Sequence, residues 1–185
     1  MILMKGQSKQ VWINEGYRVV AETGFQNLNV EYIGRAIYKS KSSFYYYFGD
    51  KELFEAELLD YHLKRIDAFT QEIAKCEKVR PDFIRVLLEF KTDLFFHRQL
   101  RIHRGNPAYK KCLDTGFDKF ATAVLDLWVT FFDLPHNRRF VRTFIFFLAE
   151  NFLMQISLDK YTYNWIDNYI LELQNMIKQL NTKEF

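Results

Sequence analysis

The chain has 185 residues, of which 49% are hydrophobic and 26% are charged. This length suits one compact body with a small attached domain, and the composition excludes an intrinsically disordered chain. The net charge of +3 is too small to indicate nucleic acid by itself, so any basic binding surface has to be local.

The sequence shows no pattern typical of a membrane span, a signal peptide, a metal site or a disulfide framework. No apolar run reaches the roughly 18–20 residues of a membrane span. The apolar start, Met1–Met4, stops at Lys5, well short of a signal-peptide core. Cys76 and Cys112 fit neither a zinc pattern nor a disulfide framework, and the four histidines show no ligand spacing. We therefore expect a cytoplasmic protein with reduced cysteines and with no metal and no cofactor.

Catalytic motifs are missing as well. There is no Glu-x-x-His pattern of the kind that holds metals in helical bundles. There is also no glycine loop for phosphate and no nucleophile elbow. We therefore expect that the protein is not an enzyme.

The spacing of apolar residues indicates helices throughout. No long segment alternates apolar and polar residues, and no hairpin signal lies between β-rich runs. Positions of one helix face recur at steps of three and four, first as Leu59, His62, Ile66, Phe69, Ile73 and Cys76 and later as Ile166, Ile170, Leu173 and Ile177. We predict an all-α protein with about nine helices, three of which begin near Pro81, Pro107 and Pro135.

The first fifty residues divide into three predicted helices, over about residues 5–23, 30–37 and 41–47. Gly24 ends the first helix, because glycine adopts the left-handed conformation cheaply. Asn29 and Ser40 are the expected N-caps of the second and third helices. Gly34 is costly in mid-helix, so we expect it to permit close packing. Two short helices across a three-residue break, preceded by a stabilising helix, are typical of a helix-turn-helix.

The third of these helices carries polar groups that suit DNA. Its geometry turns three side chains inward, Phe44, Tyr47 and Phe48. Five remain outside, Lys41, Ser42, Ser43, Tyr45 and Tyr46, and such groups can donate to phosphates and base edges. Between Tyr32 and Gly49 there are three cations, Arg35, Lys39 and Lys41, and no acid. The alternative is a core aromatic cluster, but three consecutive tyrosines span roughly 300° of a helix and cannot share one core.

Residues 8–55 resemble the DNA-binding domain of the TetR family of transcriptional regulators. The resemblance is carried by Gly24-Phe25, Asn29-Val30, Ile33 and the run Ser40–Phe48. Its most specific part is the stretch from Tyr45 to Lys51-Glu52-Leu53-Phe54. The chain departs from the family at four positions: Tyr38 and Ser42 stand where the family favours glycine, and Gly34 and Ile37 stand where it favours alanine.

The resemblance also implies roles for single residues. Tyr45 and Lys51 would hold the phosphate backbone, and Asn29 would cap the second helix near a phosphate. Four residues would face the major groove: Lys41, Ser42, Ser43 and Tyr46. Lys39 belongs to the same basic surface. The implied architecture is a helix-turn-helix domain, residues 1–50, packed on a larger helical regulatory and dimerisation domain, residues 51–185.

Three segments of the second domain stand out. The stretch 137–158 is apolar nearly all round, so we expect one side to meet its own core and the other a partner chain. With the last helix, about 161–180, it would form a homodimer that reads a palindromic site. Glu150 and Asn151 interrupt the apolar stretch 137–158, and they either pair with neighbours or orient a bound ligand. A basic run, His97–Arg104, is either a solvated loop or an anion-binding surface.

The sequence thus predicts a TetR-like, DNA-binding transcriptional repressor that a small-molecule ligand releases from a palindromic operator. Such a ligand has to bind the two states of the protein with different affinities. The alternative is a DNA-binding regulator without a small-molecule ligand, which a protein partner controls.

Overall fold

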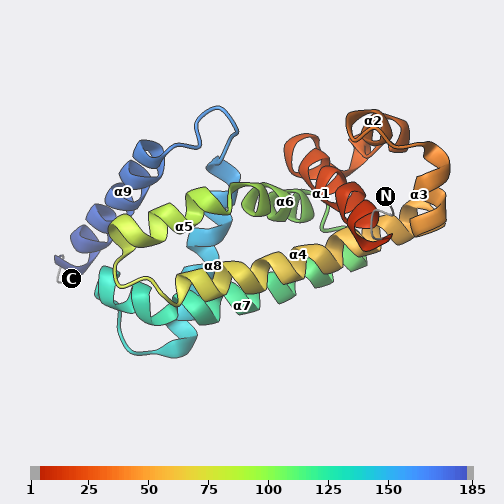
Figure 1. The fold of residues 1–185 in the computed structure, drawn as a ribbon. Coiled ribbons are helices and arrows are strands. Elements are labelled where there is room, and N and C mark those ends of the chain that lie inside the picture. Colours follow the sequence, from red (N-terminus) through yellow and green to blue (C-terminus); the bar gives the residue numbers. More distant parts are fainter. Residues whose placement is uncertain (1–4, 183–185) are drawn as a thin grey trace. The chain divides into compact units, whose positions relative to one another are not determined.

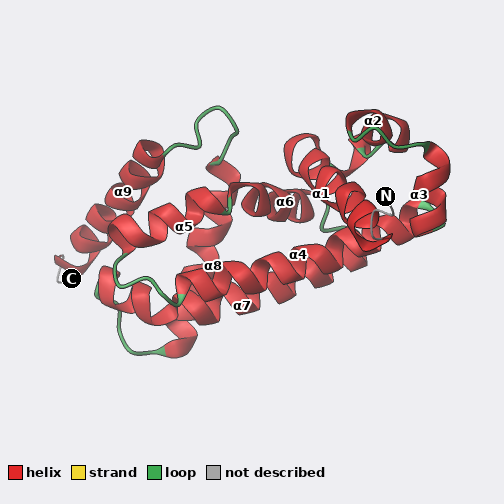
Figure 2. Ribbon diagram, in the orientation of Figure 1, coloured by secondary structure: helices red, strands yellow, loops and turns green. Residues whose placement is uncertain are grey.

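The computed structural model describes residues 5–182, and the side chains of 8–179, so Met1–Met4 lie outside the described residues. Within this range the chain forms helices joined by loops, with no strand (Figure 2). The elements (Figure 1) are α1 (Lys5–Thr23), η1 (Phe25–Asn27), α2 (Val30–Ala36), α3 (Lys41–Phe48), α4 (Lys51–Ile73), η2 (Val79–Phe83), α5 (Ile84–Glu89), α6 (Lys91–Ile102), α7 (Pro107–Phe132), α8 (Arg138–Gln155) and α9 (Tyr163–Thr182). The nine α-helices of the described chain confirm the predicted all-α class. None of them is long and apolar enough to cross a membrane.

The chain forms two compact units. The first unit consists of the residues up to Arg65 together with Thr92–Thr115. It therefore holds α1, α2 and α3, the first part of α4, most of α6 and the start of α7. The second unit consists of Ile66–Lys91 and the residues from Gly116 onward, so it holds α5, α8, α9 and the remaining parts of α4 and α7.

Polar caps define the short helices of the first unit, as the sequence predicted. The side chain of Asn29 accepts hydrogen bonds from the backbone of Glu31 and Tyr32, at 2.9 and 3.0 Å, and so begins α2. Ser40 caps α3 through the backbone N–H of Ser43. Gly24 follows α1 with a φ of 91°, a conformation that glycine adopts without strain. The chain turns between these helices because each cap satisfies N–H groups that the helix itself leaves unpaired.

The core of the helix-turn-helix is aromatic. The rings of Trp12 and Phe44 meet edge to face at 5.3 Å, and Phe48 and Phe54 lie 4.6 Å apart beside them. Each is nearly inaccessible to solvent, and burial of such a side chain contributes roughly 1.5–3 kcal/mol. Gly34 admits this packing, because a Cβ atom there would lie 2.8 Å from the backbone oxygen of Lys39. The cluster therefore fixes α3 against α1 and α4.

The helix starts of the second half agree with the sequence only in part. Pro107 is the first residue of α7, as predicted. The prediction that a helix begins at Pro135 is wrong, because α8 begins at Arg138. Asn137 supplies its N-cap and accepts a hydrogen bond of 3.1 Å from the N–H of Phe140. Pro81 lies inside η2, one turn before α5.

The core of the second unit joins α5, α7, α8 and α9. Its buried side chains include Phe83, Ile84, Val124, Trp128, Val141, Ile145, Ile166 and Ile170. Arg80 binds Asp167 of α9 through two hydrogen bonds of 2.5 and 2.8 Å. The hydroxyl of Tyr161 donates to the backbone oxygen of Leu87 at 2.8 Å. These contacts hold α9 against α5.

Candidate nucleic-acid interface

The outer face of α3 presents the polar side chains that the sequence places there. Tyr46 is 66% exposed, and Lys41, Ser42 and Tyr45 are also exposed. Phe44 and Phe48 are buried on the opposite face. The partition follows from helix geometry, because residues 44 and 48 lie one turn apart on the side that meets α1 and α4. The helix therefore has one buried apolar face, which packs against α1 and α4, and one exposed polar face.

The N-terminal turn of α3 restricts what Ser43 can do. Its hydroxyl donates a hydrogen bond of 2.8 Å to the carbonyl of Ser40. The hydroxyl hydrogen is thereby engaged, while lone pairs of the oxygen remain able to accept. In this rotamer, Ser43 can accept from an amino group on a base edge, which adenine and cytosine present in the major groove.

Lys41 forms an ion pair that the sequence did not reveal. Its Nζ lies 2.9 Å from the Oε1 atom of Glu31 in α2, and both side chains are exposed. The hydrogen bond between them raises the pKa of Lys41 and lowers that of Glu31. The acid-free stretch noted in the sequence starts at Tyr32, one residue later. One of its three cations is therefore already paired in the free protein.

The remaining predicted contacts flank α3. Lys51 opens α4, and its Nζ lies 3.8 Å from Glu55, a distance at which the cation is only loosely held. The Tyr109 hydroxyl donates to the same Glu55 at 2.6 Å. Lys39 is half-buried in the turn before α3, and Asn29 is exposed at the start of α2. All the predicted DNA-binding residues thus lie at the N-cap of α2, in the turn before α3, on α3 or in the first turn of α4.

The turn between α2 and α3 contains a left-handed tyrosine. Tyr38 has a φ of 56° and is 95% exposed. Its backbone N–H donates to the carbonyl of Arg35 at 3.3 Å, and the next N–H, of Lys39, donates to Gly34 at 2.8 Å. These bonds close the turn while Tyr38 stays in the left-handed region. A residue with a Cβ atom pays about 1–2 kcal/mol for it.

A buried polar cluster lies behind the helix-turn-helix in the first unit, and we name it the Tyr17 cluster. Tyr17 of α1 lies 2.6 Å from His62 Nδ1 of α4 and donates to Asp93 of α6 at 2.9 Å. Arg65 binds both oxygens of Asp93 at 2.9 Å. His62 Nε2 lies 3.0 Å from Nδ1 of His97. Tyr17, His62, Asp93 and His97 are buried.

Burial controls the protonation of the Tyr17 cluster. It lowers the pKa of His97 to about 4 and lowers the pKa of His62 well below its usual value, with the neighbouring His97 adding to the second effect. Burial, and after it the charge of Asp93, raises the pKa of Tyr17. His97 is buried on α6, so the interpretation of residues 97–104 as a solvated loop is wrong for this residue. The one sequence signal was His62, which occupies a core position of an otherwise apolar stripe.

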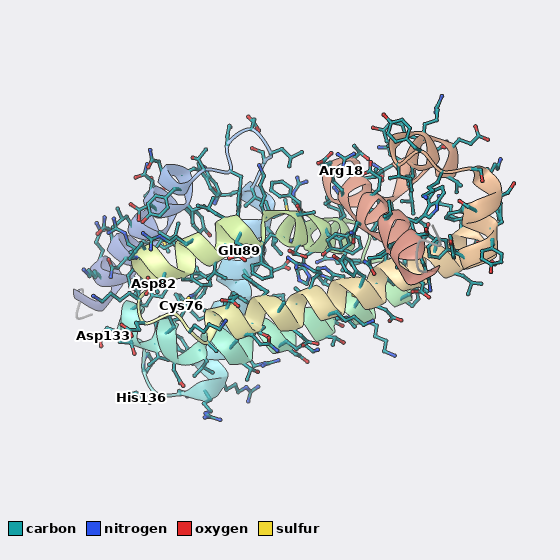
Figure 3. All side chains as sticks on the ribbon, in the orientation of Figure 1. Arg18, Cys76, Asp82, Glu89, Asp133 and His136 are labelled. Atoms are coloured by element: carbon teal, nitrogen blue, oxygen red, sulfur yellow. The ribbon has the colours of Figure 1, made fainter. Side chains whose placement is uncertain are left out.

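The second unit contains a groove of about 860 Å³. This volume lies within the range of about 300–1,000 Å³ that is usual for small-molecule sites. The end of α4, the following loop, η2 and α7 line it. Its apolar residues include Ile73, Val79, Leu127 and Phe131, and its charged residues are Glu77, Lys78, Arg80 and Asp126. Cys76, which follows α4 (Figure 3), also belongs to the lining.

Glu150 and Asn151, the residues predicted to orient a ligand or to pair with neighbours, lie on α8 and do not line this groove. Asn151 is exposed, and its Oδ1 atom accepts from Gln155 at 2.7 Å and from the hydroxyl of Tyr169 at 2.9 Å. Glu150 is half-buried. The contacts of Asn151 are those expected of a residue that pairs with its neighbours.

A stripe of apolar side chains runs along the exposed side of α8. Phe140, Phe147 and Met154 recur every seven residues, so they lie on one face of the helix. Phe147 is 64% exposed and the other two are also exposed. Single exposed apolar residues are ordinary, but a continuous patch marks an interaction surface.

Comparisons with known proteins bear on this site. Residues 13–56 match the sequence profile described as "Bacterial regulatory proteins, tetR family". The matched segment includes every residue that the sequence predicts to bind DNA. A search of curated protein sequences gives no match. One solved structure that the chain resembles is multidrug binding protein EbrR complexed with imidazole, at 15% identity, 76% of this chain, 93% of that chain and a TM-score of 0.43. Values this low carry no information on ligands or partners of this chain.

Proposed function

We propose that the chain is a dimeric repressor of the TetR family of bacterial regulatory proteins, which a small molecule releases from a palindromic operator. The match of residues 13–56 to the tetR family model supports DNA binding. The main support for the proposal is the amphipathic character of α3. Its exposed face presents hydroxyl, phenol and ammonium groups, and its aromatic face is buried.

In the proposed complex α3 lies in the major groove. The N-terminal residues of a recognition helix contact base edges, and here these residues are Lys41, Ser42 and Ser43, with Tyr46 one turn further. Tyr45, Lys51 and Lys39 hold phosphates on either side. Asn29 caps α2, whose N-terminus favours a nearby phosphate. Residues 1–50 thus supply DNA recognition, and residues 51–185 supply regulation and dimerisation.

The proposed dimer forms through α8 and α9. The exposed stripe of Phe140, Phe147 and Met154 supports this, because an isologous interface places the same apolar face of two chains together. Met176 of α9 is also exposed. Two such chains present two copies of α3, which is what a palindromic operator requires.

The proposed effector site is the groove of the second unit. Its apolar residues would bury the body of the molecule. Glu77, Lys78 and Asp126 make no ion pair within the described residues, so they remain available for polar groups of a ligand. We therefore expect an amphipathic effector. Allosteric release requires that this effector binds the DNA-free state more tightly than the DNA-bound state.

The test of DNA recognition is selection of bound duplexes from a random pool at near-physiological salt. We expect an enriched palindrome with half-sites about one helical turn apart. Ser43→Ala and Tyr46→Phe should then change preference at individual base pairs, by roughly 1–3 kcal/mol. Recovery of unrelated sequences only, with weak and salt-sensitive binding, would contradict the proposed operator.

The test of the groove uses the selected operator. A set of amphipathic compounds is screened for release of the wild-type protein from that DNA. Ala123→Phe fills the groove with a ring, so it should abolish release by active compounds while operator binding persists. Thr122→Phe, at the neighbouring exposed position of α7 that does not line the groove, is the matched control. Equal release of both variants would place the effector elsewhere, and release by no compound would favour control by a protein partner.

A further inference from the structure

The side chain of Tyr38 has no hydrogen-bond or ring partner among the described residues. It is 95% exposed. It forms no hydrogen bond and no ring contact with any residue in the described range, although aromatic rings pack closely throughout the neighbouring core. The ring and hydroxyl therefore contribute no packing that would explain a tyrosine at this position.

The backbone makes the choice of residue more costly. With a φ of 56°, Tyr38 occupies the left-handed region, where glycine is unstrained and a residue with a Cβ atom is not. The turn itself needs only this conformation, because its hydrogen bonds come from backbone groups of Tyr38 and Lys39. No contact among the described residues of the first unit offsets the backbone strain of Tyr38. Such strain indicates a contact outside the chain.

The position of Tyr38 identifies DNA as that contact. It stands two residues before Ser40, the N-cap of α3, and between the cations Arg35, Lys39 and Lys41. In a helix-turn-helix the first helix crosses the phosphate backbone and the second enters the major groove, so the turn between them passes next to the DNA. A phenol donates one hydrogen bond and carries no charge.

We propose that Tyr38 is a DNA-contacting residue whose hydroxyl donates to a phosphate oxygen beside the base pairs that α3 reads. The inference rests on the proposed function. It differs from the roles implied by the family resemblance, because the family favours glycine at this place and glycine offers no side chain. The tyrosine thus adds a contact to the strained turn of this chain.

The experiment measures operator affinity at several salt concentrations, and thermal stability, for three variants. Tyr38→Phe removes only the hydroxyl and should weaken binding roughly threefold to tenfold. The loss should be equal for all operator sequences, and the salt dependence should stay unchanged because no charge is removed. Tyr38→Gly removes the side chain and the strain, so affinity should fall at least as much while the melting temperature does not fall. Tyr61→Phe, at a tyrosine of α4 outside the DNA surface and outside the proposed dimer interface, is the control and should bind as the wild type does.

Each other outcome overturns a definite statement. If the wild type selects an operator and both Tyr38 variants bind it with wild-type affinity, the contact of Tyr38 is wrong and the proposed function stands. If the loss is confined to particular base pairs, Tyr38 reads bases, and the phosphate contact is wrong. If the wild type selects no sequence at all, the proposed function fails, and this inference fails with it.

Discussion

The hydroxyl of Tyr17 donates a hydrogen bond of 2.9 Å to Asp93 Oδ1, and this contact orders the protons of the whole cluster. Asp93 accepts only, because Arg65 binds both of its oxygens. The oxygen of Tyr17 is then left to accept from Nδ1–H of His62. The Nε2 atom of a neutral His62 has to accept in turn, so the hydrogen bond of 3.0 Å comes from Nδ1–H of His97. Both histidines are therefore neutral Nδ1–H tautomers.

This proton order predicts the cost of removing the Tyr17 hydroxyl. In Tyr17→Phe, the buried Nδ1–H group of His62 loses its partner, and Asp93 Oδ1 keeps only its hydrogen bond from Arg65. A buried polar group without a partner costs about 1–3 kcal/mol. We expect the free energy of unfolding to fall by about that amount in urea titrations.

Tyr61→Phe is the matched control for this variant. Tyr61 packs edge to face on Tyr17 at 5.0 Å, but its hydroxyl makes no hydrogen bond within residues 8–179. Its loss should change the free energy of unfolding by a few tenths of a kcal/mol at most, about the size of an ordinary surface substitution. Equal effects of the two variants would show that the Tyr17 hydroxyl is not bound as described.

The two neutral histidines predict that acid destabilises the first unit. Burial holds the pKa of His97 at about 4, whereas an unfolded histidine titrates near about 6.5. The unfolded chain therefore binds more protons between these values, and stability is fully present above pH 6.5 and falls as pH decreases toward 4. His97 alone should remove about 2 kcal/mol between pH 6.5 and 5, and His62 acts in the same direction.

The pH dependence is checked by urea titrations at pH 7, 6 and 5. His97→Gln keeps an amide N–H that can donate to His62 but does not titrate, so it should flatten the profile. A parallel profile for His97→Gln and wild type would mean that other groups cause the acid sensitivity. Wild-type stability that is constant down to pH 5 would rule out the buried neutral histidines.

Local features of the first unit were predictable from the sequence, and the Tyr17 cluster was not. Asn29 and Ser40 act as caps within three residues of their partners, and the inward face of α3 follows from the helical repeat alone. The Tyr17 cluster joins residues of α1, α4 and α6, and its directly hydrogen-bonded pairs lie up to 76 positions apart. Pairings at such distances depend on how the helices pack, and no local pattern encodes them.

The geometry of the turn before α3 and the ion pair of Lys41 were also not predictable from the sequence. The sequence identified Tyr38 as a replacement for glycine, but only the structure gives its positive φ and its exposure. Lys41 was recognised as a cation of the DNA surface. Its pairing with Glu31, ten residues earlier, depends on the angle between α2 and α3.

That pairing predicts that Glu31 weakens DNA binding. Glu31→Gln removes a negative charge beside the DNA surface and releases the ammonium group of Lys41 for contact with DNA. We expect tighter binding to all duplexes and a steeper dependence of affinity on salt, by up to about one unit of slope. Fluorescence anisotropy over a series of salt concentrations measures both quantities.

Two further variants separate the Lys41–Glu31 pair from the phosphate contact proposed for Lys51. In a Lys41→Ala background, Glu31→Gln should have a smaller effect, because the coupling of the two residues is lost. Lys51→Ala should do the opposite of Glu31→Gln, with weaker binding to all sequences and a slope reduced by about one unit. Identical effects of Glu31→Gln with and without Lys41 would assign them to general repulsion.

The exposed stripe of α8 predicts the effect of a charge on assembly. Phe147→Glu removes the most exposed ring of the stripe, and across a two-fold axis it brings two carboxylates together in an apolar interface. We expect the proposed dimer to dissociate at concentrations at least about tenfold higher than for wild type, since 1.4 kcal/mol corresponds to a factor of ten. Sedimentation equilibrium measures this constant, and affinity for a palindromic operator should fall with it. Ile102→Glu, at an exposed position of α6 in the first unit, is the control and should leave assembly unchanged. A Phe147→Glu protein that assembles as wild type does would remove α8 from the interface.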